Sequence, residues 1–454
     1  MTTIVDGTVP HFVLAPLVRG LCINAVNMPR TVIPGTAAGT AIPGGTAVPG
    51  GAVPAGTTVP EMALTIDISS AFSKSSDGAA LFNEESAAKI LSEAYAAWEF
   101  EEAPSGAQAV CCSAGPVKKQ PSCIALNGKN GLLGLYWIDR DLDSALKRRE
   151  ENDSSFIEET IPPAQGTDIT PRGLSSKGRC DVVKNRVAVV SGGAQGFGEQ
   201  IVLGLASSGA LVFIADLNIK GAKKLADRIN AANGRTSAIA VPLDVTSEES
   251  AEALFKTIAE TAGGLDLCVS NAGILNAGSV MEQELKSFKL TTEVNYVGYF
   301  IMTKYSGRLL KLQHLTSPSW KTDIIQINSK SGLEGSNKNG AYAGSKFGGI
   351  GLTASFALEL VEYNVKVNSI CPGNFFDGPL WSDPEKGLFV QYLNAGKVAG
   401  AKTIADVKAY YEGRVPMKRG CEGPDVMKAI YYIVEQDYET GQAVPVTGGQ
   451  VMLH

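Results

Sequence analysis

The sequence predicts an α/β protein whose carboxyl-terminal part, residues 181–454, forms a doubly wound parallel sheet. Three observations support this prediction: apolar β-branched runs alternate with amphipathic stretches, a glycine-rich turn follows the first run, and Asp216 ends the second. This alternation is typical of parallel βαβ units whose strands are covered on both faces. In such sheets ligands bind at the carboxyl ends of the strands.

Length and composition describe a soluble globular protein of more than one domain. The chain has 454 residues, of which 44% are hydrophobic and 19% charged, and the formal net charge is -6. This length exceeds one ordinary hydrophobic core, so two or three domains are expected. The charge gives no general attraction to nucleic acid or anionic lipid. No apolar run reaches the ~18 residues that span a bilayer, and the start of the sequence lacks a signal-peptide pattern.

Cysteine usage agrees with a cytoplasmic location. The eight cysteines are scattered, and no CxxC pair stands near any of the three histidines. A zinc site has little support, and we expect no bound metal. Reduced thiols in the cytoplasm are the simplest explanation of the pattern.

Residues 1–161 are expected to form a smaller mixed α/β accessory domain, followed by a linker at 162–180. Residues 31–60 are rich in Pro and Gly. Their spacing faintly resembles hexapeptide β-helix turns, but so few turns could not bury a core, so a flexible or extended segment is favoured. The other expected elements are a strand at 62–69, a helix at 86–102, two strands within 123–138 and a solvated helix over 143–159. No motif in this part indicates a chemical role.

After residue 181 the expected elements alternate in type. Apolar runs predict strands at 182–193, 210–218, 237–245, 265–273 and 323–329. Helical periodicity predicts helices at 199–209, 220–234 and 250–263. The long stretch before the fifth strand is also expected to be helical.

The turn between the first strand and the first helix reads GGAQGFG over residues 192–198. Glycines permit close approach of a ligand to the backbone, and the following helix presents free N–H groups to a pyrophosphate. A glycine-rich turn alone is weak support, but its place between a strand and a helix favours a Rossmann dinucleotide site. The residues expected to contact the cofactor here are Gly192, Gln195, Gly196, Phe197 and Gly198.

Asp216 stands 18 residues after Gly198, at the end of the second strand. A carboxylate there can accept hydrogen bonds from both hydroxyls of an adenosine ribose and repels a 2′-phosphate. No Arg or Lys follows it directly, so NAD is favoured over NADP. The alternative is an aspartate that merely faces water at the end of a strand.

Ser329, Tyr342 and Lys346 could form an acid/base site. If residues 342–346 are helical, their spacing places the phenol and the ammonium on one face. An ammonium beside a phenol favours the phenolate and lowers a pKa that is normally near ~10. Tyr342 would then serve as acid or base in an alcohol–ketone interconversion near neutral pH. The alternative is a buried tyrosine on an amphipathic helix with a solvated lysine.

These motifs together resemble the short-chain dehydrogenase/reductase family over roughly residues 183–454. In the order of that family they are GGAQGFG, Asp244-Val245, Ser270-Asn271-Ala272-Gly273, Asn295, Ser329, Tyr342-x-x-x-Lys346 and Cys371-Pro372-Gly373. Agreement of seven spaced elements makes the resemblance specific. The sequence departs from the family at Ser191, where Thr is usual, and at Ser270, where Asn is usual. It also lacks the common Thr after Pro372-Gly373, which leaves the contact to the nicotinamide carboxamide unassigned.

The resemblance implies a role for each matching residue. Tyr342 is expected to donate or accept the proton, and Lys346 to hold the nicotinamide ribose and lower the pKa of Tyr342. Ser329 is expected to bond the reacting substrate oxygen, and Asn295 to support a water and proton relay. The remaining positions implied to contact the cofactor are Asp244, near the adenine amine, with Val245, Asn271, Ala272, Gly273, Pro372 and Gly373.

Residues 374–416 are expected to form a substrate lid that carries Trp381 and a helix capped by Thr403 and Asp406. A substrate phosphate would need cationic or N–H partners. Lys330 is preferred because it adjoins Ser329, although a solvated surface lysine is an equal alternative. The other candidates for this contact are Lys338, Lys386 and Lys397. Lys418 and Arg419 are expected to form structural ion pairs instead.

The segments IIQINSKSG and VPMKRGC resemble members of the family that act on sugar-alcohol phosphates. This resemblance implies an NAD-dependent enzyme with a small sugar-phosphate substrate, and sorbitol 6-phosphate and fructose 6-phosphate are the expected pair. It also implies a homo-oligomer, a tetramer or a dimer. The alternatives are a non-phosphorylated polyol dehydrogenase, a 3-oxoacyl thioester reductase, or a cofactor-binding scaffold whose amino-terminal part carries the role. Asp216 argues against an NADPH-preferring reductase.

Overall fold

The computed structural model describes residues 2–4, 13–19, 31–34, 64–67, 69–74, 80–99, 117–121, 123–128, 131–139, 142–151, 156–160 and 179–453, the last range without residues 386, 395 and 397. The chain divides into two compact units. The first comprises Met1–Lys177, Phe255–Leu265 and Arg308–Trp320, and the second Gly178–Leu254, Asp266–Gly307 and Lys321–His454. Each unit is described by itself.

The second unit is built on a seven-stranded sheet, and all of its strands are parallel. In spatial order the strands are β12 (Ala238–Pro242), β11 (Leu211–Asp216), β10 (Val187–Ser191), β13 (Leu267–Ser270), β14 (Thr322–Ile327), β15 (Val365–Pro372) and β16 (Ala443–Val446). The doubly wound α/β fold expected from the sequence is confirmed. The strand order reverses at β10, between β11 and β13, which is where such sheets open a ligand crevice.

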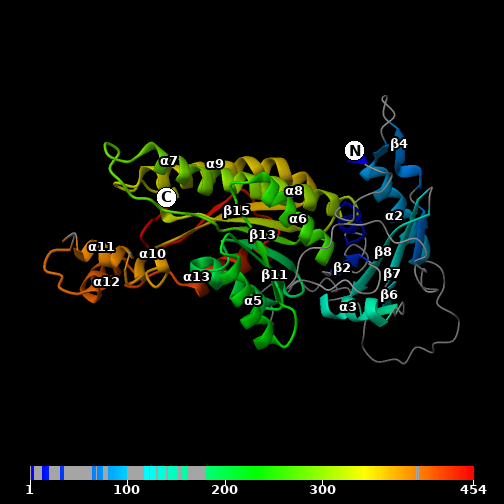
Figure 1. Ribbon diagram of the computed structural model, residues 1–454, viewed down its shortest axis with the longest axis horizontal. Helices are drawn as coiled ribbons and strands as arrows, with labels where there is room; N and C mark the ends of the chain where they lie inside the picture. Colours follow the sequence, from blue (N-terminus) through cyan, green and yellow to red (C-terminus); the bar gives the residue numbers. More distant parts are fainter. Residues whose placement is uncertain are drawn as a thin grey trace, which may run out of the picture. The chain divides into compact units, whose positions relative to one another are not determined.

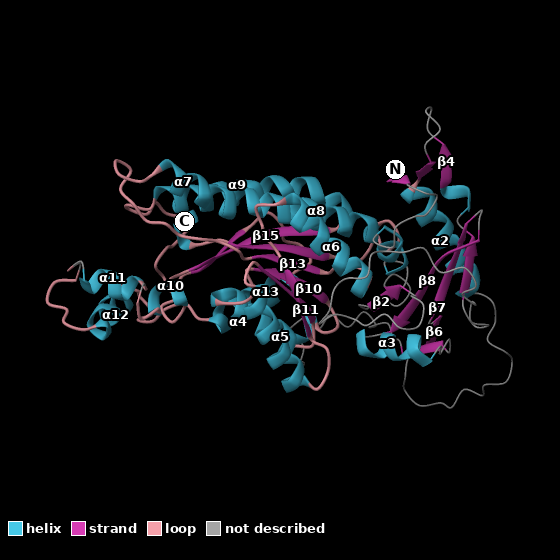
Figure 2. Cartoon of the chain, viewed as in Figure 1, coloured by secondary structure: helices cyan, strands magenta, loops and turns pink. Residues whose placement is uncertain are grey.

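Helices cover both faces of this sheet (Figures 1 and 2). The helices on one side are α4 (Gly196–Ser207), α5 (Ile219–Asn233) and α13 (Gly423–Glu435). The helices on the other side are α6 (Glu248–Ala262), α8 (Gly298–His314) and α9 (Gly340–Leu360). Burial from both sides explains the almost continuous apolar runs of the central strands, because every residue of β10, β13 and β14 is buried.

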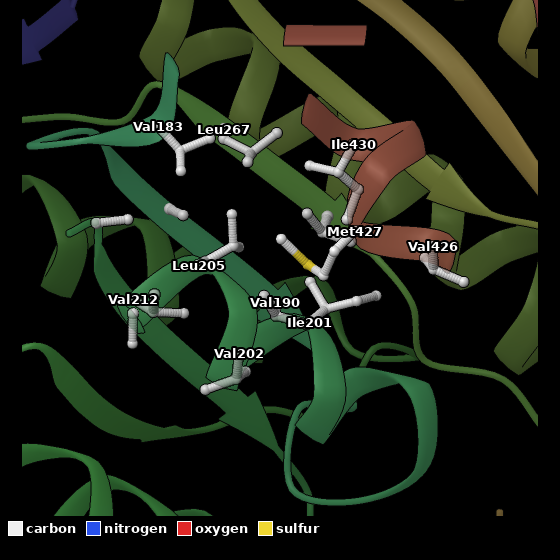
Figure 3. Packing of buried hydrophobic residues seen from close by; sticks show 14 of the residues in the cluster. Val183, Val190, Ile201, Val202, Leu205, Val212, Leu267, Val426, Met427 and Ile430 are labelled. Atoms are coloured by element: carbon white, nitrogen blue, oxygen red, sulfur yellow. The ribbon is translucent and has the colours of Figure 1, made fainter. Parts of the chain in front are cut away.

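A hydrophobic core lies between the sheet and the layer of α4 and α13 (Figure 3). Val190 of β10 packs there with Ile201 and Leu205 of α4 and with Met427 and Ile430 of α13. These side chains come from segments more than 200 residues apart. Helix α13 therefore completes the core next to the glycine turn. The packing fixes the start of α4 relative to the end of β10.

A π-helical turn, Glu293–Val297, separates α7 (Leu285–Thr292) from α8. Turns of this kind interrupt α-helices and often occur at functional sites, because the extra residue redirects a side chain. Asn295, one of the expected site residues, lies inside this turn and is buried.

Residues 374–416 contain three short helices, α10 (Pro379–Ser382), α11 (Leu388–Asn394) and α12 (Ile404–Gly413). They share a hydrophobic core of their own, made of Phe376, Trp381, Leu388, Phe389, Val398, Val407 and Val415. The cap expected at Thr403 is confirmed: its hydroxyl accepts from the N–H of Asp406, whose carboxylate accepts from the N–H of Thr403.

The described residues of the first unit form strands and helices, as the sequence predicts. One sheet contains β1 (Thr2–Ile4), β5 (Ala80–Phe82) and β4 (Phe72–Lys74), and a second contains β2 (Thr31–Pro34), β8 (Gly131–Asp139), β7 (Cys123–Gly128) and β3 (Leu64–Asp67). The antiparallel pair β7 and β8 is the one expected within residues 123–138. Helix α2 (Glu84–Glu99) begins after Asn83, whose side-chain oxygen accepts from the N–H of Ser86.

One expectation for this unit needs correction. The solvated helix expected over residues 143–159 ends at Glu151 as α3 (Leu142–Glu151), and Phe156–Thr160 forms strand β9, paired with β6 (Val117–Pro121). The β-branched and aromatic start of β9 explains the change, because such residues favour strands. The first four residues of the Pro-rich segment are extended, as strand β2, which pairs with β8. Its remainder, residues 35–60, and most of the expected linker lie outside the described residues.

Within the described ranges, no helix combines the length and the apolar character needed to cross a bilayer. The same residues contain no group of three or more His, Cys, Asp or Glu side chains suited to a metal ion. Cys268, Cys371 and Cys421 are buried free thiols.

Candidate active site

The glycine turn after β10 is shaped for close backbone approach. Gly192 has a φ of +62°, and a Cβ atom on it would lie 2.9 Å from the Cα of Ala272. A Cβ on Gly198 would collide with the carbonyl oxygen of Gly192 and lie 2.6 Å from Nδ2 of Asn271. The turn therefore requires glycine at both positions, because the segments after β10 and β13 touch there.

Side chains lock these two segments together. The hydroxyl of Ser191 accepts hydrogen bonds from the N–H groups of Asn271 (3.0 Å) and Ala272 (3.1 Å). In return, Nδ2 of Asn271 donates to the carbonyl oxygens of Ser191 and Gly192, each at 3.0 Å. Ser191, which stands where Thr is usual in the family, supplies the hydroxyl for these bonds.

Helix α4 begins with unpaired N–H groups, because its N-cap residue Gln195 makes no side-chain capping bond. Such a helix end attracts an anion through these N–H groups and the helix dipole. Gly196 has a φ of +62°, and a Cβ on it would meet only Pro379 Cδ, at 4.0 Å. The start of α4 is therefore suited to the pyrophosphate of a dinucleotide.

Asp216 ends β11 beside this turn. Its carboxylate accepts from the N–H of Ala194 at 2.9 Å and from the N–H of Asn218 at 2.8 Å. The side chain braces the glycine turn and remains half-exposed, with lone pairs left for ribose hydroxyls. The geometry is compatible with both the functional and the purely structural interpretation of Asp216.

Asp244 and Val245 follow β12, whose Pro242 pairs with Asp216. The exposed carboxylate of Asp244 accepts from the N–H and the hydroxyl of Thr246, at 2.9 Å and 2.7 Å. Val245 is buried, and its Cγ2 lies 3.0 Å from the position of a Cβ on Gly298. Both residues lie at the carboxyl edge of the sheet, and their expected contact with adenine stays a prediction.

Pro372 and Gly373 end β15 at the same edge. Gly373 donates to the carbonyl oxygen of Val446 at 2.9 Å, and a Cβ on it would lie 2.7 Å from Oε1 of Gln450. Backbone from β15 and β16 therefore meets at Gly373.

Ser329, Tyr342 and Lys346 come together as the sequence predicts. Ser329 caps a single 3₁₀ turn after β14, and its hydroxyl accepts from the N–H of Ser331 at 3.1 Å. Tyr342 lies in the first turn of α9, with Lys346 one turn later on the same face. The Lys346 ammonium lies 5.6 Å from the centre of the Tyr342 ring and donates to the carbonyl oxygen of Ile327 at 2.9 Å.

The expected depression of the pKa of Tyr342 by Lys346 is not found. Burial raises the pKa of Tyr342 above its ordinary value, and the hydrogen bond from Ser329 lowers it only in part. Burial also lowers the pKa of Lys346 to about 8. The cause is desolvation, because an ammonium that is itself removed from water offsets little of the cost of burying a phenolate beside it.

Asn295 joins the π-helical turn to the segment after β13. Its Oδ1 accepts from the N–H of Ile274 at 2.8 Å, and its Nδ2 donates to the Ile274 carbonyl at 2.9 Å and to the Ser345 hydroxyl at 3.1 Å. A Cβ on Gly273 would lie 3.3 Å from Oδ1 of Asn295 and 3.7 Å from the Lys346 ammonium. Asn295 thus holds Gly273 near Lys346, and the proton relay stays a prediction.

Residues 186–381 match the short chain dehydrogenase family. The chain is 40% identical to sorbitol-6-phosphate 2-dehydrogenase of Escherichia coli, over 59% of this chain and 99% of that protein. The chain belongs to the short-chain dehydrogenase family. It is also 32% identical to trans-4-hydroxycyclohexanecarboxylate dehydrogenase of Sinomonas cyclohexanicum, over 60% of this chain and 94% of that protein. The crystal structure of sorbitol-6-phosphate 2-dehydrogenase from Erwinia amylovora is matched over 59% of this chain and 100% of that one, with 40% identity and a TM-score of 0.54.

As a member of the short-chain dehydrogenase family, the protein is an oxidoreductase that uses a nicotinamide cofactor, NAD or NADP, and acts on a small molecule. The residues at the carboxyl edge fit such a dinucleotide. Gly192 and Gly198 leave a cradle that a Cβ would fill, the start of α4 offers free N–H groups, and Asp216 stands at the end of β11.

The lysines proposed for a substrate phosphate differ in their surroundings. Lys330 is half-exposed and adjoins Ser329, and its ammonium forms no hydrogen bond or ion pair with a described residue. Lys338 is exposed and has a φ of +55°, whereas Lys386 and Lys397 lie outside the described residues. Arg419 pairs with Asp425 at 2.6 Å and 2.9 Å, as the structural interpretation predicts. Lys418 donates instead to the carbonyl oxygen of Gly413 at 2.7 Å.

An aromatic contact next to the expected lid was not predicted from the sequence. The rings of Phe197 and Phe375 stack with centres 4.5 Å apart and planes 17° apart. A Cβ on Gly378 would lie 2.5 Å from the Phe375 ring, so this ring is held between the glycine turn and the lid backbone. Phenylalanine within the glycine-rich turn and the pair Phe375-Phe376 directly after Gly373 were the available signals.

Replacing Tyr342 by Phe is expected to lower turnover about 10²–10⁴-fold, because the variant keeps the ring and loses the acid/base group. Steady-state oxidation of an alcohol substrate, followed by NADH absorbance, measures the loss. Affinity for NADH, measured by fluorescence titration, should stay within about twofold. Y438F is the matched control, because Tyr438 is 99% exposed. Near-normal turnover of Y342F would remove the assignment.

The raised pKa of Tyr342 predicts opposite pH dependences for the two directions. Ketone reduction needs the protonated phenol, which is present at neutral pH and is lost only as the pH rises toward the raised pKa. Alcohol oxidation needs the phenolate, so its rate should increase with pH from neutrality until Lys346, whose pKa is about 8, loses the charge that stabilises the phenolate. Rate profiles from pH ~6 to ~10 at saturating cofactor test this in both directions. An oxidation rate that does not change across that range contradicts the prediction.

Proposed function

We propose that the protein is an NAD-dependent dehydrogenase that interconverts D-sorbitol 6-phosphate and D-fructose 6-phosphate. The observation that carries the proposal is the 40% identity that extends over 99% of the Escherichia coli sorbitol-6-phosphate 2-dehydrogenase. The alignment spans nearly the whole relative, which supports a shared substrate class as well as a shared cofactor turn. The geometry of Ser329, Tyr342 and Lys346 is compatible with the chemistry this requires.

In this proposal one residue of the site transfers the proton, and the others position the reacting groups. The phenol of Tyr342 takes the proton of the C2 hydroxyl in oxidation and returns it in reduction. The hydroxyl of Ser329, which bonds to that phenol, holds the reacting oxygen beside it. The charged ammonium of Lys346 stabilises the phenolate. This ammonium is present below the pKa of Lys346, which is about 8. Bound NAD would accept the hydride, and the glycine turn, Asp216 and Lys346 would hold it.

Lys330 is the proposed contact for the substrate phosphate. Its ammonium follows Ser329 directly and makes no ion pair with a described residue, so an anion would meet a cation without a competing carboxylate. A charge-assisted bond of this kind contributes about 1.5–3 kcal/mol. The segment Asn374–Pro416 is the proposed lid over the substrate.

A homo-oligomer in the cytoplasm, either a tetramer or a dimer, completes the proposal. Large apolar side chains on α8 and α9 support it, namely Phe300 (41% exposed), Phe347 (47%) and Leu358 (82%). Apolar groups exposed on neighbouring helices mark surfaces that other chains cover. The amino-terminal residues are proposed to be an accessory to a carboxyl-terminal dehydrogenase domain at 181–454.

Sorbitol 6-phosphate is expected to give a kcat/KM with NAD at least about tenfold above that of sorbitol, because the phosphate adds a charge-assisted contact. K330A should lower kcat/KM for sorbitol 6-phosphate about 10–100-fold and leave kcat/KM for sorbitol unchanged. K223A is the matched control, because Lys223 is exposed on α5. Oxidation of other polyols without activity on sorbitol 6-phosphate would refute the substrate, and reduction of a 3-oxoacyl thioester would favour the rival function.

Replacing Asp216 by Ala is expected to raise the KM for NAD about 10–100-fold, because the ribose hydroxyls lose an ionised acceptor. The ratio of kcat/KM for NAD to that for NADP should fall, since the repulsion of a 2′-phosphate is removed. D227A is the matched control, an exposed carboxylate on α5. Stronger activity with NADP than with NAD in the unaltered protein would overturn the choice of cofactor.

A further inference from the structure

Asn328, the residue between β14 and Ser329, uses every polar atom of its side chain. It is only 3% exposed. Its Oδ1 accepts from the N–H of Ser329 at 2.8 Å, and its Nδ2 donates to the carbonyl oxygen of Lys346 at 2.9 Å and to Oε1 of Gln326 at 2.8 Å. The carboxamide oxygen and both N–H groups therefore each have a protein partner.

The orientation of this carboxamide follows from its partners. A backbone N–H can only donate, and a backbone carbonyl can only accept. The oxygen of Asn328 must therefore face Ser329, and its NH₂ group must face Lys346. A reversed amide would lose both bonds and set like groups against each other.

The side chain links two elements that the chain itself connects only through a loop. Ser329 belongs to the turn after β14, whereas Tyr342 and Lys346 belong to α9. Lys346 is held at two points, because its carbonyl accepts from Asn328 and its ammonium donates to Ile327. The relative placement of the serine hydroxyl and the lysine depends on these two crossings.

A buried polar chain supports Asn328 from behind. Oε1 of Gln326 accepts from Asn328 and also from the hydroxyl of Ser369, at 3.0 Å. That hydroxyl lies 2.6 Å from the hydroxyl of Thr353, which lies 3.0 Å from the hydroxyl of Tyr299. The chain runs from β14 through β15 and α9 to α8, so the amide of Asn328 is anchored to the core on its inner side.

We propose that Asn328 is a positioning residue, which sets the placement of Ser329 relative to Tyr342 and Lys346. The inference rests on the acid/base roles assigned to those three residues. Without the amide, the N–H of Ser329 and the carbonyl of Lys346 lose their link, and the serine turn can shift relative to α9. The hydroxyl of Ser329 would then bond Tyr342 less closely.

The proposal is tested with N328A, N328D and the matched control S369A. S369A removes one bond to the same oxygen of Gln326 and touches neither Ser329 nor Lys346. N328D has the shape of asparagine and can still accept from Ser329, but it cannot donate to Lys346 or Gln326. It is therefore the variant to use if N328A does not fold. Thermal unfolding reports the structural loss in all three.

The decisive readout is the titration of the Tyr342 phenol without cofactor, obtained as an ultraviolet difference between each protein and its Y342F counterpart. The other titratable groups that face Tyr342 are Lys346 on α9 and Cys371 on β15, and burial raises the pKa of that thiol to about 12. N328A should titrate at higher pH than the unaltered protein, because the bond from Ser329 is weakened. In N328D the added carboxylate raises the pKa of the phenol further through its charge. S369A should not move the titration.

Kinetic measurements separate this inference from the proposed function. N328A and N328D should lower kcat about 10–100-fold while the Kd for NADH stays within about twofold, and S369A should keep both. If N328A or N328D matches S369A in titration and kcat, the inference is overturned. If Y342F itself retains turnover, the catalytic assignment has failed instead, whatever the behaviour at position 328.

Discussion

Burial of an ammonium beside a phenol is the constraint on which this site depends. Lys346 is 4% exposed, and its charged form keeps one hydrogen bond, to the carbonyl of Ile327. Removing an ammonium from water disfavours its charge, which lowers the pKa of Lys346 to about 8 and leaves the protonated phenol of Tyr342 as the resting form. In the proposed role such a site donates a proton at neutral pH, and it accepts one only when something further stabilises the phenolate. The positive ring of an oxidised nicotinamide is a group of the right charge.

The same edge of the sheet is held together by a small number of polar side chains. Ser191 and Asn271 join the segments after β10 and β13, Asn295 joins the segment after β13 to the π-helical turn, and Asn328 joins the turn after β14 to α9. Each is a short side chain that bonds to backbone groups on another element. It therefore fixes the distance between the two elements and has few rotatable bonds of its own. The reactive groups lie on segments that these bonds immobilise, which is what preorganisation of an acid/base site requires.

The sequence predicted most of the second unit, because the signals there are local and agree with one another. Apolar runs of five or six residues, glycine at two strained positions and a Tyr–Lys spacing of one helical turn each have few alternative explanations. The pKa of Tyr342 could not be predicted, since spacing reports which groups are neighbours but not how far both are removed from water. The end of α3 and the strand Phe156–Thr160 were missed for a different reason. The strand follows a charged stretch that has a helical pattern, and its pairing partner, Val117–Pro121, lies far away in the chain, so local sequence does not reveal it.

The segment Asn374–Pro416 is constructed as a small body with its own interior. Phe376, Trp381 and Phe389 pack edge to face or tilted, with ring centres 4.9 Å, 5.1 Å and 5.7 Å apart. The capping box at Thr403 and the ion pair between Asp377 and Lys408, at 2.6 Å, complete it. A segment that buries its own aromatic core can change position without losing that core. Because the ring of Phe375 stacks on Phe197 of the glycine turn, such a movement would be felt where the pyrophosphate is expected to bind. If this segment is the proposed lid, the stack would link cover of the substrate to the state of the cofactor turn and would help to exclude water from the reaction.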